Sequence, residues 1–175
     1  MSKCRMMTID ASTTATGMAI FDNAVYQDVI SLDLDDKKTG KKTIMETRFP
    51  IMAKWMYENV ISYKPDIIYI EETVVQRNAE EQRFLTRLQG VIYVYCMEHD
   101  CEFNTIRPTE WRKYAGIDQG KKQRKELKAA ALELVKTKYG LIVTEDEAEA
   151  ILIGYAVINK FEELEEIIKK KAGIR

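Results

Sequence analysis

The sequence predicts a mixed α/β domain in which helices surround a central sheet. Short apolar runs with the composition of strands open the chain, and similar runs return at residues 67–71 and 102–106. Longer segments with helical spacing of apolar residues separate and follow these runs. The chain has 175 residues, which fits one domain with a substantial core, so we expect residues 1–175 to form a single domain.

Three strands are predicted before the first helix. The first runs from Cys4 to Asp10 and ends in a carboxylate, and a small, hydroxyl-rich segment follows it. The second begins at Gly17, and Asp22-Asn23 has the composition of a hairpin turn into a third strand at about Ala24–Leu32. The polar residues 33–43, with four lysines, are expected to form a loop.

The first helix is predicted over Met45–Tyr63, where the spacing of apolar residues is helical. We expect Ile51, Trp55 and Met56 to face inward. Pro50 is expected in the first turn, where a missing N–H group costs least.

The remaining elements alternate between strand and helix. Ile67–Glu71 is nearly all apolar, which favours a central strand covered on both faces, and it too ends in a carboxylate. We expect Thr144 to cap a helix that runs through Ile158. The other predicted elements are a helix over Asn78–Glu98 in which Gly90 permits close packing, a strand over Glu102–Ile106, helices over Pro108–Tyr114 and Lys121–Tyr139, and a last amphipathic helix to about Lys171.

Composition narrows the class of protein. Hydrophobic residues make up 46% and charged residues 31%, which is typical of a globular domain. No apolar run approaches the length of a membrane span. The three cysteines have neither CxxC nor zinc-ligand spacing, and they fit the reducing cytoplasm. The net charge of -1 excludes a uniformly basic surface, yet residues 107–128 hold eight basic residues against three acidic ones.

Acidic residues lie at three positions next to apolar segments that are expected to be buried. Asp10 and Glu71 each follow an apolar strand, so neighbouring strands would bring them to one edge of the sheet. Asp146 and Glu149 are three residues apart and share one helix face. Four clustered carboxylates repel one another, and oxygen-only ligands select hard cations such as Mg²⁺ or Mn²⁺. Taken singly, each acid also fits an ordinary turn or the first turn of a helix.

These segments resemble the RuvC family of Holliday-junction resolvases, and its phage-type members in particular. The resemblance rests on Ile9-Asp-Ala-Ser-Thr-Thr-Ala-Thr-Gly17, Ile70-Glu-Glu-Thr73 and Asp146-Glu-Ala-Glu-Ala150, in that order, with the basic Gly120-Lys-Lys-Gln-Arg-Lys125 before the third motif. It covers roughly Met6 to Val157. It implies a ribonuclease-H-like fold, a homodimer, and symmetric nicking of opposing strands of a four-way DNA junction with Mg²⁺ or Mn²⁺. The implied location is the cytoplasm of a bacterial or phage-infected cell.

The resemblance also implies roles for individual residues. Asp10, Glu71, Asp146 and Glu149 match the four metal-binding acids, with Asp10 bridging two ions. Lys122 best matches a family lysine near the scissile phosphate, and Lys121 is a close second. Glu149 stands where many bacterial members have Asp, and Val74 stands where they carry a stacking aromatic residue.

The basic stretch at residues 107–128 is predicted to contact DNA. Its cations crowd a helix N-terminus, which opposes the helix dipole unless a phosphate binds there. A solvated charged face is the alternative, and a tight turn is the alternative for the two hydroxyl residues after Asp10. The candidate DNA-binding residues are Ser12, Thr13, Arg112, Lys113, Lys121, Lys122, Arg124 and Lys125. Trp111, within this stretch, is interpreted as a packing residue, with DNA contact as the alternative.

Other functions compete with junction cleavage. A sugar-kinase or actin-like ATPase also begins with an acid and a Thr-rich turn, but it needs two such domains and glycine-rich loops, and this chain has only 8 glycines. A non-catalytic junction-binding module would keep the acids only for folding. A nuclease of the same fold would prefer forks, flaps or RNA-containing duplexes.

Overall fold

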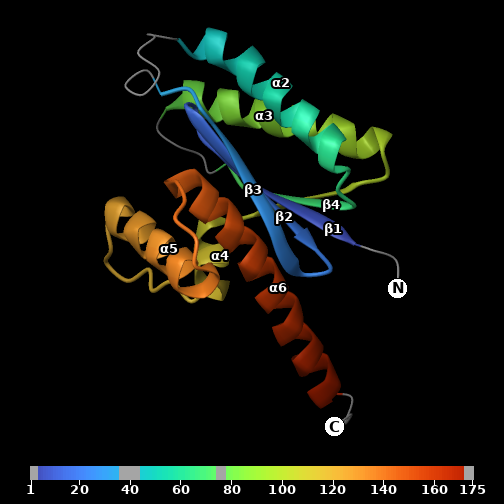
Figure 1. Ribbon diagram of the computed structural model, residues 1–175, viewed down its shortest axis with the longest axis vertical. Coiled ribbons are helices and arrows are strands. Elements are labelled where there is room, and N and C mark those ends of the chain that lie inside the picture. Colours follow the sequence, from blue (N-terminus) through green and yellow to red (C-terminus); the bar gives the residue numbers. More distant parts are fainter. Residues whose placement is uncertain (1–3, 36–43, 74–77, 172–175) are drawn as a thin grey trace.

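Five strands form one mixed sheet in the computed structural model, which describes residues 4–35, 44–73 and 78–171 (Figure 1). Their order across the sheet is β3-β2-β1-β4-β5; the first three are antiparallel neighbours, and β4 and β5 run parallel to β1. The strands are β1 (Arg5–Ala11), β2 (Ala15–Asp22), β3 (Val25–Asp33), β4 (Ile67–Glu71) and β5 (Glu102–Ile106). The predicted mixed sheet is confirmed. Val74 and the lysines of the 33–43 segment lie outside the described residues.

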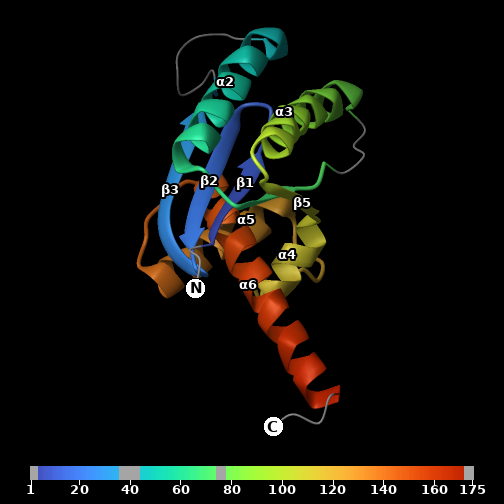
Figure 2. The ribbon, with the colours of Figure 1, turned by 90° about the vertical axis from the view of Figure 1, so that its right-hand side faces the viewer.

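Helices cover both faces of this sheet (Figures 1 and 2). One face packs on α2 (Met45–Tyr63) and α3 (Ala79–Glu98), with an apolar core. The opposite face packs on α4 (Pro108–Tyr114), α5 (Arg124–Tyr139) and α6 (Glu145–Lys171), with a second core. Burial of apolar side chains on both faces supplies the main driving force for this layered arrangement. No helix in the described part of the chain is long and apolar enough to cross a membrane.

The β2–β3 hairpin turns at Asn23 and Ala24, one residue later than predicted. Both residues have positive φ, 50° and 65°. Two such residues make the tight turn whose twist matches that of the flanking strands. Asn23 Oδ1 also accepts a 2.9 Å hydrogen bond from the backbone N–H of Cys4, which ties the turn to the start of β1.

Helix α2 has the predicted bounds but a different inward face. Met52, Met56 and Val60 are fully buried, whereas Ile51 is 47% exposed. The prediction that Ile51 faces inward was therefore wrong. Pro50 lies in the second turn instead of the first, because the helix already begins at Met45. The one hydrogen bond that the proline removes is outweighed by the packing of the apolar face.

Helix α6 replaces the two helices predicted after residue 144. Neither glycine nor proline follows Ile158 before Lys171, so nothing in this stretch breaks the helix. Asn159 instead donates a 2.9 Å hydrogen bond from Nδ2 to the carbonyl of Tyr114 and binds α6 to α4. The distal part of α6 projects beyond the sheet (Figure 1).

Close packing depends on glycines other than the one predicted. A Cβ atom on Gly90 would meet nothing within 4 Å, so the predicted packing role of Gly90 was wrong. A Cβ atom on Gly154 would overlap the ring of Phe21, and one on Gly17 would overlap the backbone of Asp146. These two glycines therefore let α6 lie directly on β2.

Candidate active site

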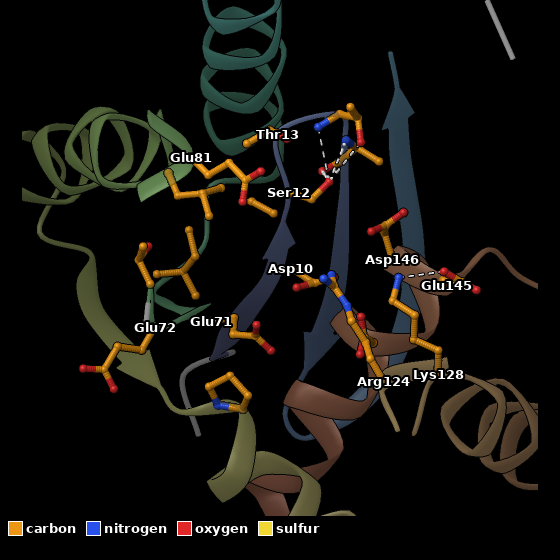
Figure 3. Close-up of a pocket in the computed structure, with 18 of the residues that line it drawn as sticks. Asp10, Ser12, Thr13, Glu71, Glu72, Glu81, Arg124, Lys128, Glu145 and Asp146 are labelled. Carbon is orange, nitrogen blue, oxygen red and sulfur yellow. Dashed lines mark hydrogen bonds and ion pairs between the residues drawn. The ribbon is translucent and has the colours of Figure 1, made fainter. Parts of the chain in front are cut away.

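A pocket of about 640 Å³ opens at the end of the sheet where β1 and β4 finish (Figure 3). The side chains at this end come from segments far apart in the sequence. The acids predicted from the sequence are all among its lining residues: Asp10, Glu71, Asp146 and Glu149. We call this cavity the acidic pocket.

The sheet register brings Asp10 beside Glu71. Strands β1 and β4 are parallel, and their last paired residues are Ile9 and Ile70. Asp10 and Glu71 each follow directly, so their side chains reach the same edge, as Figure 3 shows. Asp10 is only 6% exposed, which is unusual for a carboxylate.

Helix α6 supplies the other two acids. Its start is fixed by a reciprocal pair of hydrogen bonds: Thr144 Oγ1 accepts from the N–H of Glu147 at 3.3 Å, and Glu147 Oε2 accepts from the N–H of Thr144 at 2.8 Å. The predicted capping role of Thr144 is thus confirmed. Gly17 lets the backbone of Asp146 rest on β2, which sets the first turn of α6 beside the end of β1.

Burial and the charges of neighbouring acids raise the pKa values of Asp10, Glu71 and Asp146. The pKa of Asp10 is well above its usual value because of burial first, and then because of the charges of Glu71, Glu149 and Asp146. Burial also raises the pKa of Asp146, against the effect of nearby Lys128. A cation would stabilise the ionised form of these acids.

Burial is likewise the largest cause of the raised pKa of Glu71, and a hydrogen bond from Trp111 opposes it. The Trp111 indole Nε1–H donates to Glu71 Oε2 at 2.7 Å, and the ring is fully buried. The sequence indicated a packing role for Trp111 and gave no sign of this partner, which lies 40 residues away.

Basic side chains partly balance the acids. Arg112 Nη2 donates to Glu149 Oε1 at 3.2 Å, and both side chains are largely buried. Lys128 Nζ pairs with Glu145 Oε2 at 2.6 Å at the rim of the acidic pocket (Figure 3). Lys128 belongs to the basic stretch at residues 107–128 but is not among the candidate DNA-binding residues. Its position four residues after Arg124, which also lines the pocket, is the signal that would have identified it.

The candidate DNA-binding residues do not all meet in the pocket. Ser12, Thr13, Arg112 and Arg124 line it. The other four candidates are exposed and lie outside the pocket lining.

Three of these lysines lie near the start of α5: Lys121, Lys122 and Lys125. Lys122 Nζ lies 3.4 Å from Asp118 Oδ2. The ammonium group of the fourth, Lys113, lies 5.1 Å from the centre of the Tyr114 ring.

The Ser12 hydroxyl serves the turn after β1. Its oxygen accepts from the backbone N–H groups of Thr14 at 3.3 Å and Ala15 at 2.9 Å (Figure 3). These bonds are those of a tight hydroxyl turn, the alternative raised for this residue from the sequence.

The donor set of the acidic pocket fits a hard divalent cation, because it consists of carboxylate oxygens that lie in a mutually repelling group. As the side chains stand, however, no three acidic, histidine or cysteine residues in the described ranges are arranged to hold a metal ion. Arg112 engages one of the acids, Glu149, whereas the bond from Trp111 to Glu71 Oε2 leaves the other oxygen of Glu71 available. Binding of a cation would therefore require movement of the Glu149 side chain within the pocket.

Comparison with known proteins identifies the family. The profile described as "Crossover junction endodeoxyribonuclease RuvC" matches residues 6–157. The protein of that name from Mycolicibacterium smegmatis is 26% identical over 106 residues, which cover 61% of this chain and 57% of the relative. The one from Rickettsia akari is 25% identical over 118 residues, covering 67% of this chain and 74% of the relative. The match thus spans little more than half of the first of these relatives.

Solved structures show the same fold. RuvC of Thermus thermophilus, determined in complex with a Holliday junction substrate, has a TM-score of 0.66 at 12% identity, over 91% of this chain and 96% of that one. The yeast mitochondrial Holliday junction resolvase Ydc2 has a TM-score of 0.59 at 14% identity, over 93% of this chain and 81% of that one. The predicted ribonuclease-H-like sheet flanked by helices is confirmed. With a family profile that spans most of its length, the chain belongs to the RuvC family of crossover junction endodeoxyribonucleases.

Proposed function

We propose that this protein is a DNA endonuclease that nicks opposing strands of four-way junctions by two-metal-ion hydrolysis of phosphodiester bonds. One observation carries the proposal: four carboxylates from β1, β4 and α6 line one pocket, and the charges of the other three help to raise the pKa of Asp10. The name of the family supports the reaction and the substrate. We treat residues 1–175 as one nuclease domain, and we expect it to act as a homodimer.

In this proposal Asp10, Glu71, Asp146 and Glu149 hold Mg²⁺, for which Mn²⁺ would substitute, since both prefer oxygen ligands. When bound, such ions supply Lewis-acid activation of the phosphodiester and lower the pKa of water. Glu149 has to leave its bond with Arg112 to take part, which frees the guanidinium for a phosphate oxygen.

Basic residues at the pocket rim are suited to orient the DNA backbone. Arg124 and Lys128 lie one helical turn apart on α5 and both line the acidic pocket. We expect them to position the phosphate at the reaction site, with the exposed Lys121, Lys122 and Lys125 extending the contact along α5. Lys122 remains the candidate for the lysine nearest the scissile phosphate.

The cell compartment follows from the same assignment. A junction nuclease acts where chromosomal or phage DNA lies, so we place this one in the cytoplasm of a bacterial or phage-infected cell. The thiols of Cys4, Cys96 and Cys101 are free, which fits a reducing compartment.

Cleavage of a synthetic immobile four-way junction tests the proposal. We expect Mg²⁺-dependent nicks at symmetric positions, abolished by Asp10→Asn, while junction binding in a gel-shift assay is kept or strengthened as repulsion of the phosphates falls. Glu98→Gln, which removes an exposed acid at the end of α3, is the matched control and should cut like the wild type.

Matched substrates separate the alternatives. Faster cutting of forks, flaps or RNA-containing duplexes would replace the four-way junction as the substrate while keeping the chemistry. Binding of junctions without cleavage under any divalent cation would identify a non-catalytic binding module. Unchanged cleavage by Asp10→Asn would remove the metal-site assignment itself.

A further inference from the structure

The backbone of Glu71 is fixed from two sides. Gln89 of α3 donates from Nε2 to the Glu71 carbonyl at 3.0 Å. On the other side, the N–H of Glu72 donates to the carbonyl of Ile106 at 2.8 Å and extends the pairing of β4 with β5. These bonds set where the side chain of Glu71 begins, but they leave its own rotatable bonds free.

Trp111 restricts that remaining freedom. Its indole Nε1–H, which can only donate, forms a 2.7 Å bond to Glu71 Oε2. The bond is short, as expected when a carboxylate accepts. Because the ring is fully buried in the core on the α6 side of the sheet, the donor cannot swing away without disrupting that core.

The helix that carries Trp111 is itself anchored. The carbonyl of Tyr114 accepts from Asn159 Nδ2 at 2.9 Å, and Lys160 Nζ pairs with Glu110 Oε1 at 2.6 Å. Both bonds join α4 to α6, the helix that bears Asp146 and Glu149. The indole therefore links Glu71 to the element that holds the opposite acids.

The neighbouring residue reinforces this arrangement. The Arg112 guanidinium lies 4.7 Å from the centre of the Trp111 ring and bonds Glu149 from there. Two consecutive residues of α4 thus hold one acid from each side of the acidic pocket.

We propose that Trp111 is a positioning residue, whose indole N–H holds the Glu71 carboxylate in the orientation needed for cation binding. This inference rests on the proposed function of the acidic pocket. A packing role alone would require only that the buried N–H find some acceptor, and its loss would then change stability without changing affinity for cations. Loss of a partner that orients a metal ligand typically weakens metal binding by about 10–100-fold.

Calorimetric titration with Mn²⁺, in the absence of DNA, tests the proposal. Trp111→Phe keeps most of the ring volume and removes the N–H, so we expect Mn²⁺ affinity to fall by about 10–100-fold. Trp55→Phe is the matched control, because Trp55 packs with the α2 and α3 core on the opposite face. In a Glu71→Gln background, Trp111→Phe should weaken Mn²⁺ binding little further, since the two residues act as one unit.

Indole resonances provide a second measurement with Trp111 intact. The chain has 2 tryptophans and hence two indole Nε1–H signals, which Trp55→Phe assigns. We expect Glu71→Gln to move the Trp111 signal in the cation-free protein, because a neutral amide oxygen is a weaker acceptor. The Trp55 signal should stay in place.

Two results would overturn the positioning role: Trp111→Phe binding Mn²⁺ as tightly as the wild type, or a Trp111 resonance unmoved by Glu71→Gln. Failure of the underlying function looks different. In that case the wild-type protein itself would bind no Mn²⁺ and cut no junction, and the positioning role would fall with it.

Discussion

Acidic side chains lie at both ends of β1, but their surroundings differ: an arginine pairs with them at one end, and other acids surround them at the other. At the start of the strand, Arg5 bonds Asp22 through Nε at 2.8 Å and Nη2 at 3.1 Å, and its backbone N–H donates to Asp66 at 2.6 Å. The hydrogen bond to Asp22 raises the pKa of Arg5 despite the cost of burial. At the far end, burial and like charges raise the pKa of Asp10 instead.

This difference distinguishes the charges at the start of β1, which stabilise the fold, from those of the acidic pocket, which we assign to function. A bidentate guanidinium satisfies the carboxylate at the start of β1, so that end of the sheet gains stability from its charges. The acidic pocket keeps carboxylates in mutual repulsion, which lowers the stability of the cation-free protein and favours a ligand that carries positive charge.

The largest predicted effect compares one acid from each end. Asp146→Asn should lower the rate of junction cleavage by roughly 10³-fold, since loss of cation-based stabilisation of about 4 kcal/mol has that effect on rate. Asp22→Asn should leave the rate per folded molecule unchanged. Single-turnover cleavage, normalised to the folded fraction, measures both. A similar loss from both variants would mean that the two ends do not differ in function.

The second prediction concerns the paired end. Arg5→Gln removes the bonds to Asp22 and a 2.7 Å bond to the carbonyl of Tyr63, so the free energy of unfolding should fall by about 2–3 kcal/mol. Urea denaturation followed by circular dichroism measures this change. No loss of stability would show that Arg5 is not the anchor of this end.

The third prediction has the opposite sign. Asp10→Asn relieves repulsion in the acidic pocket, so in EDTA the variant should unfold with a free energy about 1–2 kcal/mol above that of the wild type. Urea denaturation in EDTA is again the measurement. A less stable variant would indicate that the carboxylate of Asp10 contributes to the fold.

The fourth prediction is a dependence on pH. Asp10, Glu71 and Asp146 have raised pKa values in the folded state, so the native protein binds more protons than the unfolded chain. The free energy of unfolding in EDTA should therefore fall as pH rises above 3.8 and 4.5, the ordinary pKa values of Asp and Glu. For each extra proton that the native state binds, the fall is under about 1.4 kcal/mol per pH unit. Melting temperatures across this range, with EDTA and with Mg²⁺, measure it; Mg²⁺ should flatten the slope.

Much of the pocket was predictable because local rules place its acids. An apolar strand that ends in a carboxylate puts that group at a sheet edge, and a spacing of three puts Asp146 and Glu149 on one helix face. These rules need no knowledge of distant contacts. The capping of α6 by Thr144 and the bounds of α2 follow from equally local signals.

What sequence reasoning missed depends on contacts between distant segments. Trp111 meets Glu71 only because α4 packs on α6 at the end of the sheet, and Gly17 matters because the backbone of Asp146 rests on it. The exposure of Ile51 depends on which face of α2 packs against α3. Each of these features is set by tertiary packing between distant segments. The periodicity of a single sequence predicts which residues share a face of a helix or strand, but it does not predict which segments pack together.

We infer that four carboxylates from three distant segments act together as one divalent-cation site. Its most direct test is the electron paramagnetic resonance signal of free Mn²⁺, titrated against the wild-type protein and the variants Asp10→Asn, Glu71→Gln, Asp146→Asn and Glu149→Gln. We predict saturable binding by the wild type and weaker binding by every variant. Wild-type affinity for Mn²⁺ in all four variants would show that these carboxylates do not form a cation site.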